Sequence, residues 1–110
     1  MQQELLVLTN VPDEAVARTI AHLLVEQRLA ACVNMLPAVQ SVYQWQGKLE
    51  QASEVTLLIK TTQERYTELE AAIKSAHAYQ VPEIIAVPVV AGLPDYLGWI
   101  ATETKKELNA

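Results

Sequence analysis

Two long strand-like segments, residues 29–45 and 48–61, flank the dipeptide Gln46-Gly47, which is suited to a tight turn. Pro37 is expected to bend or bulge the first segment, because proline cannot donate to a sheet ladder. At about 3.3 Å per residue, each arm spans roughly 40 Å. That length exceeds what a small domain needs. We therefore expect an extended β-hairpin that projects from the domain and pairs with something outside it.

The N-terminal segment predicts a strand followed by a helix. The aliphatic run from Leu5 to Leu8 is typical of a strand buried on both faces. Asp13 and its neighbours mark a helix start, with acidic side chains beside the positive helix end. The helix is expected to end near Arg28. Its apolar residues recur at helical spacing: Val16, Ile20, Leu23 and Leu24.

The C-terminal half predicts a helix, a strand and a last helix. Thr61 and Glu64 fit a capping box for the first of these helices. Residues 77–82 form a loop, and residues 83–90 are a strongly apolar strand interrupted by Pro88. The last helix contains Leu97, Ile100, Ala101 and Leu108.

The order of elements predicts one α+β domain over residues 1–110. Strand, helix, strand, strand, helix and strand is the split βαβ arrangement of ferredoxin-like folds, here with an extended hairpin and a C-terminal helix. This arrangement places both main helices on one face of an antiparallel sheet. The strands are so aliphatic that we expect another subunit and the last helix to cover the other face.

Composition narrows the class of protein. Hydrophobic residues make up 51% and charged residues 19%, which excludes disorder and permits a real core. The net charge of -5 argues against nucleic acid as a partner. A single cysteine and the absence of a signal-peptide pattern predict a cytoplasmic protein. No apolar run approaches the roughly 20 residues that cross a bilayer, so no membrane partner is expected.

From about residue 5 to 101 the sequence resembles the CutA divalent-cation-tolerance proteins. The matching segments are Val7-Leu8-Thr9, Pro12-Asp13-Glu14, Leu29-Ala30-Ala31-Cys32-Val33-Asn34, Ser41-Val42-Tyr43, Trp45-Gln46-Gly47-Lys48, Glu54-Val55, Lys60-Thr61-Thr62, Tyr79, Val81-Pro82-Glu83-Ile84, Tyr96-Leu97 and Trp99-Ile100. The resemblance implies a ferredoxin-like homotrimer, similar in shape to PII signalling proteins, and a role named after tolerance of copper and other divalent metals. It brings no enzymatic reaction and no obligatory cofactor.

Cys32 and His77 are the candidate metal ligands, because a soft thiolate and an imidazole suit copper or zinc. Two ligands are too few for a closed site, since structural zinc usually has four. Cys32 lies in an apolar strand, where a free cysteine often acts as a small hydrophobe. The CutA family often has His-Pro-Tyr where this chain has Ala78 as the middle residue, and the departure is expected to loosen the loop. We expect weak or surface binding of copper, with His77 as the better ligand.

Six further residues match characteristic family positions, and the resemblance suggests clefts between subunits for them. They are Trp45, Lys60, Tyr79, Glu83, Tyr96 and Trp99. Aromatic rings beside one cation and one carboxylate suit a small polar ligand. The alternative is that the aromatic residues pack at an interface, while Lys60 and Glu83 pair with each other.

Three functions remain open at the level of sequence. The first is a cytoplasmic homotrimer that responds to divalent metal or binds a small ligand. The second is a PII-like signalling or structural trimer that acts through protein partners. The third is an enzyme that uses the cleft, which converging Lys60, Tyr79 and Glu83 side chains would favour. Catalytic motifs are weak, with no Gly-rich phosphate loop, and we expect no enzymatic activity.

Overall fold

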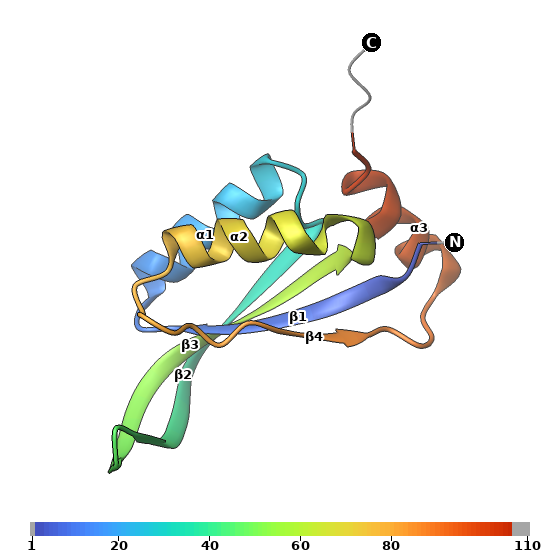
Figure 1. The fold of residues 1–110 in the computed structure, drawn as a ribbon. Helices are drawn as coiled ribbons and strands as arrows, with labels where there is room; N and C mark the ends of the chain where they lie inside the picture. The colour runs from blue at the N-terminus through green and yellow to red at the C-terminus, as the bar shows by residue number, and fades with distance from the viewer. Residues whose placement is uncertain (1, 107–110) are drawn as a thin grey trace.

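The computed structural model describes residues 2–106 as a four-stranded antiparallel sheet with two helices on one face and a third at its end (Figure 1). The elements are β1 (Glu4–Val11), α1 (Glu14–Glu26), β2 (Cys32–Trp45), β3 (Lys48–Thr62), the short 3-10 helix η1 (Gln63–Arg65), α2 (Tyr66–Ala76), β4 (Ile85–Pro88) and α3 (Pro94–Glu103). The strand order is β2-β3-β1-β4. These observations confirm the predicted α+β, ferredoxin-like fold with its extended hairpin and C-terminal helix.

β1 alternates between a buried and a half-buried face. Leu5, Val7 and Val11 point toward α1 and α2 and are buried, whereas Leu6 and Leu8 are only partly buried. The sequence predicted a strand buried on both faces, and within one chain that prediction is wrong. Within residues 2–106 the helices cover only one side of the sheet, so the second set of aliphatic side chains is left partly exposed (Figure 1).

The core lies between that covered face and the two helices. Its fully buried large side chains come from β1, α1, β3 and α2, and they include Val7, Ile20, Leu24, Leu57, Ile59, Leu69 and Ile73. Full burial of one such side chain stabilises a fold by about 1.5–3 kcal/mol. In a chain without phenylalanine, the large side chains of the core are thus aliphatic.

α1 begins and ends through defined backbone contacts. The Asp13 carboxylate accepts a hydrogen bond from the backbone N–H of Val16 at 2.9 Å, which caps the helix. The helix ends at Glu26, slightly earlier than expected. Arg28 has a φ of 58°, and the next backbone N–H, that of Leu29, returns to the carbonyl of Leu24.

The β2–β3 hairpin projects from the body of the domain, as predicted (Figure 1). Gln46 and Gly47 have φ angles of 51° and 81°, which suit the two-residue turn that matches the twist of an antiparallel pair. The pairing register shifts between Leu36 and Val39, around Pro37. The predicted bulge is thus present. The projection gives the molecule a longest dimension of 50 Å.

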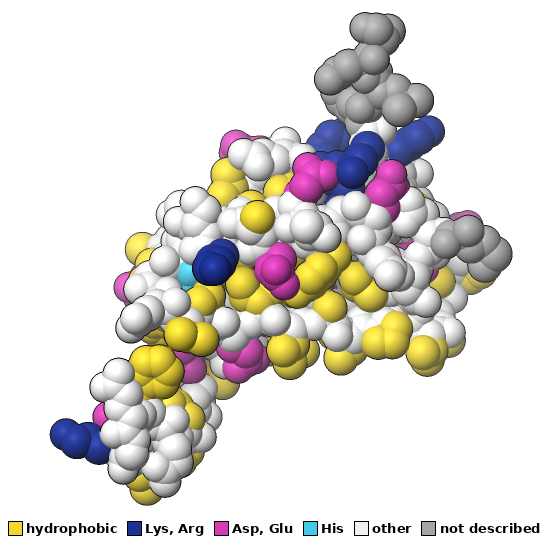
Figure 2. Space-filling view, viewed as in Figure 1, with side chains coloured by type: hydrophobic (Ala, Val, Ile, Leu, Met, Phe, Trp, Pro, Cys, Tyr) yellow, Lys and Arg dark blue, Asp and Glu magenta, His cyan; other side chains and the backbone are white. Residues whose placement is uncertain are grey.

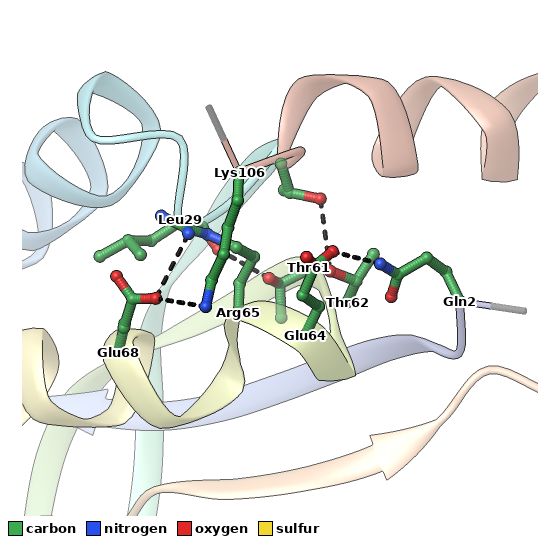
Figure 3. A network of polar contacts seen from close by, with 9 residues as sticks. Gln2, Leu29, Thr61, Thr62, Glu64, Arg65, Glu68 and Lys106 are labelled. Atoms are coloured by element: carbon green, nitrogen blue, oxygen red, sulfur yellow. Dashed lines mark hydrogen bonds and ion pairs between the residues drawn. The ribbon is translucent and has the colours of Figure 1, made fainter. Parts of the chain in front are cut away.

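The predicted capping box is wrong. Thr61 lies inside β3, and its hydroxyl donates to the carbonyl of Leu29 at 2.6 Å instead of capping a helix. Glu64 accepts a hydrogen bond from the side chain of Gln2 (Figure 3). The β-strand continues to Thr62, because its pairing with β1 extends to Glu4 and competes with helix formation there.

The C-terminal elements are shorter than predicted. β4 covers only Ile85–Pro88 of the expected 83–90, although the backbone N–H of Val89 still donates to the carbonyl of Glu4 at 3.0 Å. α3 ends at Glu103, and the predicted helix residue Leu108 lies outside the described residues. Ile100 is buried and anchors α3 on the end of the sheet. None of the helices within residues 2–106 reaches the length and apolar character of a membrane span.

Replacing the α1 cap tests the local account of this helix. Asp13→Ala is expected to lower the free energy of unfolding by about 1 kcal/mol, because the N–H of Val16 loses its acceptor. Asp13→Asn keeps an acceptor at the same position and is the matched control. Urea denaturation at fixed protein concentration measures both. Equal losses for the two variants would contradict the capping role.

Candidate functional site

A groove of about 440 Å³ opens where the hairpin leaves the sheet. Its walls come from the end of β1, from β2, from β3 and from the loop after α2. The lining includes three of the predicted ligand residues, Trp45, Tyr79 and Glu83, together with Asn10, Tyr43 and Glu54. The groove therefore combines three aromatic rings with two carboxylates.

A buried carboxylate organises the groove. Glu54 is only 7% exposed and accepts a hydrogen bond from the Tyr79 hydroxyl at 2.6 Å. Burial, together with the neighbouring carboxylate, raises the pKa of Tyr79 above its ordinary value. The phenol therefore remains a hydrogen-bond donor at neutral pH. This bond ties the loop after α2 to the base of the hairpin.

A second chain of hydrogen bonds joins Glu83 to the sheet. The side-chain amide of Asn10 donates to Glu83 at 3.4 Å, and the Thr56 hydroxyl donates to the amide oxygen of Asn10 at 2.6 Å. Asn10 thus orients the Glu83 carboxylate toward the groove. Glu83 is exposed, so its charge is available to a ligand in solvent.

Both ring nitrogens of His77 are occupied. The backbone N–H of Tyr79 donates to Nδ1 at 3.1 Å, so Nε2 carries the proton and donates to the carbonyl of Asn10 at 2.7 Å. A metal ion would have to displace one of these bonds. Within the part of the chain that the structure describes, no three His, Cys, Asp or Glu side chains cluster closely enough to hold a metal ion.

The remaining predicted residues lie at the other end of β3. Cys32 and Lys60 are directly paired between β2 and β3, with Nζ 3.9 Å from Sγ, and Lys60 also donates to the side chain of Asn34. The rings of Tyr96 and Trp99 stack at 5.6 Å nearby on α3. Burial, followed by the neighbouring Cys32, raises the pKa of Tyr96.

The six predicted ligand residues thus form two groups within one chain. Glu54 and Lys60 are separated along β3 by roughly 20 Å at about 3.3 Å per residue. Within one chain Lys60 and Glu83 do not pair with each other, because these side chains bond to Asn34 and Asn10 instead. The two groups lie at opposite ends of the same central strand.

Sequence reasoning missed Asn10, Tyr43 and Glu54 as groove residues. A usable signal existed for Glu54, which is a carboxylate directly before the aliphatic stretch of β3 that begins at the buried Val55. Glu54 and Tyr43 also belong to segments that resemble the CutA proteins. The contact between Glu54 and Tyr79 spans 25 positions of sequence, and spacing alone does not reveal it.

The sequence pattern of the CutA1 divalent ion tolerance proteins matches residues 5–103. The chain belongs to this family. It is 48% identical over 101 residues to the divalent-cation tolerance protein CutA of Thermus thermophilus, covering 92% of this chain and 98% of that one. The Thermus structure superposes with a TM-score of 0.90.

Two further CutA structures share the fold. The CutA of Xylella fastidiosa is 44% identical, with a TM-score of 0.91 over 93% of this chain and 98% of that chain. The protein of Archaeoglobus fulgidus, described as a periplasmic divalent cation tolerance protein CutA, is 35% identical, with a TM-score of 0.88 over 96% of this chain and all of that one. Membership of the CutA family confirms the resemblance stated from the sequence segments.

The bond between Tyr79 and Glu54 makes a testable prediction for this CutA protein. Glu54→Gln is expected to lower the pH at which Tyr79 ionises, because the carboxylate accepts the phenol's hydrogen bond and repels the phenolate. A free phenol ionises near pH 10. The stability from this bond is therefore fully present below about pH 10 and is lost as pH rises through the raised pKa.

The measurement is a pH titration of ¹³C-labelled tyrosine by NMR. Tyr66 serves as the internal control, because burial and a hydrogen bond to Glu70 raise its pKa to about 12 at a distant site. An unchanged Tyr79 titration in Glu54→Gln would refute the role assigned to the carboxylate.

Proposed function

We propose that the chain acts as a homotrimer in divalent-cation tolerance, with ligand sites formed between its subunits. The observation that supports this most directly is family membership over nearly the whole chain. The fold supplies the physical reason for assembly, because one face of its sheet lacks cover. The role proposed is non-enzymatic.

The uncovered surface of the sheet, which we call the open face, is aliphatic. Directly paired residues of antiparallel strands lie on the same face, and the open face comprises Leu6, Leu8, Leu58, Ile85 and Val87. Figure 2 shows hydrophobic side chains along this lower edge and on the hairpin. Ile85 is 51% exposed in the single chain. Contiguous apolar surface of this kind is typical of a subunit interface.

The two sheet edges support a closed ring of subunits. β2 and β4 are the edge strands, and the outer arm of β2 projects beyond the body with Val42 exposed. An unpaired edge is prone to pair with another chain. Contact between the hairpin of one subunit and the open face of the next is heterologous, and three such contacts close a trimer.

The same assembly accounts for the two groups of predicted ligand residues. The groove group of Trp45, Tyr79 and Glu83 and the group of Lys60, Tyr96 and Trp99 cannot meet within one chain. We propose that each lines a boundary with a neighbouring subunit. A small ligand or metal ion would then bind between chains, and its binding would respond to assembly.

Metal binding is proposed to be weak and to favour copper. Imidazole and thiol ligands suit Cu, yet His77 must give up a hydrogen bond and Cys32 lies beside the Lys60 ammonium. Displacing these partners lowers affinity. The free Cys32 thiol also supports a reducing, cytoplasmic location.

A PII-like signalling or structural role is the second candidate function. In the loop between β4 and α3, Val90 is 91% exposed and Leu93 is 69% exposed. These apolar side chains lie outside the open face and suit a protein partner. The enzyme hypothesis has less support, because Lys60 does not converge with Tyr79 and Glu83 within the chain.

Assembly is tested by light scattering. The wild type is expected to have a mass about three times 12.2 kDa. Ile85→Glu is expected to shift the mass toward the monomer, because it buries a charge in the proposed interface. Val25→Glu, at a residue of similar exposure on α1, is the matched control. A monomeric wild type would overturn the trimer.

Metal response is tested by titrating the metal-free protein with Cu and Zn. The Kd is expected to be micromolar or weaker, which corresponds to a binding free energy of about 8 kcal/mol or less in magnitude. His77→Ala is expected to reduce binding, and Cys32→Ser is expected to leave it unchanged. In a host that lacks its own CutA protein, expression of this chain is expected to restore growth on copper. Submicromolar binding abolished by Cys32→Ser would contradict the proposed weak site, and failure to restore growth would contradict the tolerance role.

A further inference from the structure

A second cavity, of about 510 Å³, lies on the helix side of the sheet, away from the open face. It is bordered by the end of α1, the start of α2 and the residues that follow α3. We call it the cationic pocket. Its charged lining consists of Arg28, Arg65, Lys105 and Lys106 together with Glu26 and Glu68.

Positive charge is concentrated in the cationic pocket, although the chain as a whole is acidic. The protein has a net charge of -5 and 8 basic residues, of which the pocket holds four. Two carboxylates oppose them, so the lining retains an excess of positive charge. Figure 2 shows Lys and Arg side chains gathered beside α3, with acidic side chains between them. The positive dipole end of α2 and the negative dipole ends of α1 and α3 all meet here, so the positive charge of the pocket comes from its side chains.

Arg65 is the central side chain of the pocket. It is only 8% exposed, and its Nη1 donates to the Glu68 carboxylate at 3.3 Å. Its buried Nε has no acceptor among the described residues. A buried guanidinium usually satisfies several donors, often through a bidentate oxyanion. Arg65 therefore has donor capacity beyond what residues 2–106 supply.

One carboxylate serves two cations in this network. Glu68 accepts from Arg65 and also pairs with Lys106 Nζ at 3.2 Å (Figure 3). Arg28 donates to the carbonyl of Thr102 at 3.1 Å, which holds its guanidinium between α1 and α3. A shared carboxylate neutralises only one of its two partners. The arrangement leaves positive charge that a bound anion can neutralise.

We propose that the cationic pocket binds a small, multiply charged oxyanion of the phosphate class. Its basic groups are four side chains around one cavity, which suits a small phosphorylated molecule rather than an extended polymer. Arg65 and Arg28 would supply planar donors to the phosphate oxygens, and Lys105 and Lys106 would supply charge at the rim. The proposal does not depend on the metal role, because the pocket and the open face lie on opposite sides of the sheet.

The test is isothermal titration of the intact, metal-free protein with inorganic tripolyphosphate at constant ionic strength. Saturable binding at one site per chain is expected, with NMR shifts at Arg28, Arg65 and Glu68. Lys105→Gln is expected to raise Kd about threefold to tenfold, because it removes one charge contact while leaving the fold intact. Lys74→Gln, on α2 outside the pocket, is the matched control and is expected to leave Kd unchanged.

Arg65→Gln is expected to weaken binding further, and its folding is checked by circular dichroism. Should that variant fail to fold, Arg28→Gln and Lys105→Gln still decide the matter. Equal weakening by Lys74→Gln would show nonspecific charge attraction and overturn the proposal, as would the absence of saturable binding. Binding to anionic phospholipid vesicles without binding to tripolyphosphate would also overturn it, because the source would then be a membrane surface.

Discussion

The pairing of β3 with both β1 and β2 is the constraint on which the rest of the structure depends. β3 is the only described strand with two long partners, and its register with them determines which side chains face the helices. Leu57 and Ile59 enter the core, while Leu58 and Lys60 face the other way. A slip of one residue would exchange these two sets. The Thr61 hydroxyl bond to Leu29 and the turn at Gly47 secure this register at opposite ends of the hairpin.

The same strand also separates the acidic groove from the basic pocket. Its hairpin end carries Glu54, which binds the loop after α2 and makes a groove lined by carboxylates. Its other end carries Lys60 beside Cys32, and the chain then enters η1 and reaches Arg65 in the cationic pocket. α2 runs from that pocket back to the groove. One chain thus presents acidic and basic sites at opposite ends of a single helix, on a sheet whose second face remains apolar.

Much of the fold could be predicted because its signals are local. Alternating spacing of apolar residues indicates strands and helical spacing indicates helices, and both patterns are visible within a short stretch of sequence. Asp13, Pro37 and Gly47 mark a cap, a bulge and a turn through their own backbone preferences. The capping box at Thr61 failed because pairing with β1 extended the strand past a local helix signal. Tertiary hydrogen bonds outweighed the local preference at that point.

The order of elements, the aliphatic core and the projecting hairpin could all be inferred from sequence, since each follows from spacing or from a single residue's backbone chemistry. The sequence also indicated the CutA family, and it predicted Trp45, Tyr79 and Glu83 as ligand residues. The packing of the folded chain was needed to show that Lys60 lies far from Tyr79. It was also needed to show that the buried Glu54 is the hydrogen-bond partner of Tyr79. It also revealed that basic side chains from three segments, including Arg65, line one cavity. Such contacts join residues distant in sequence, and their geometry depends on how the strands and helices pack together.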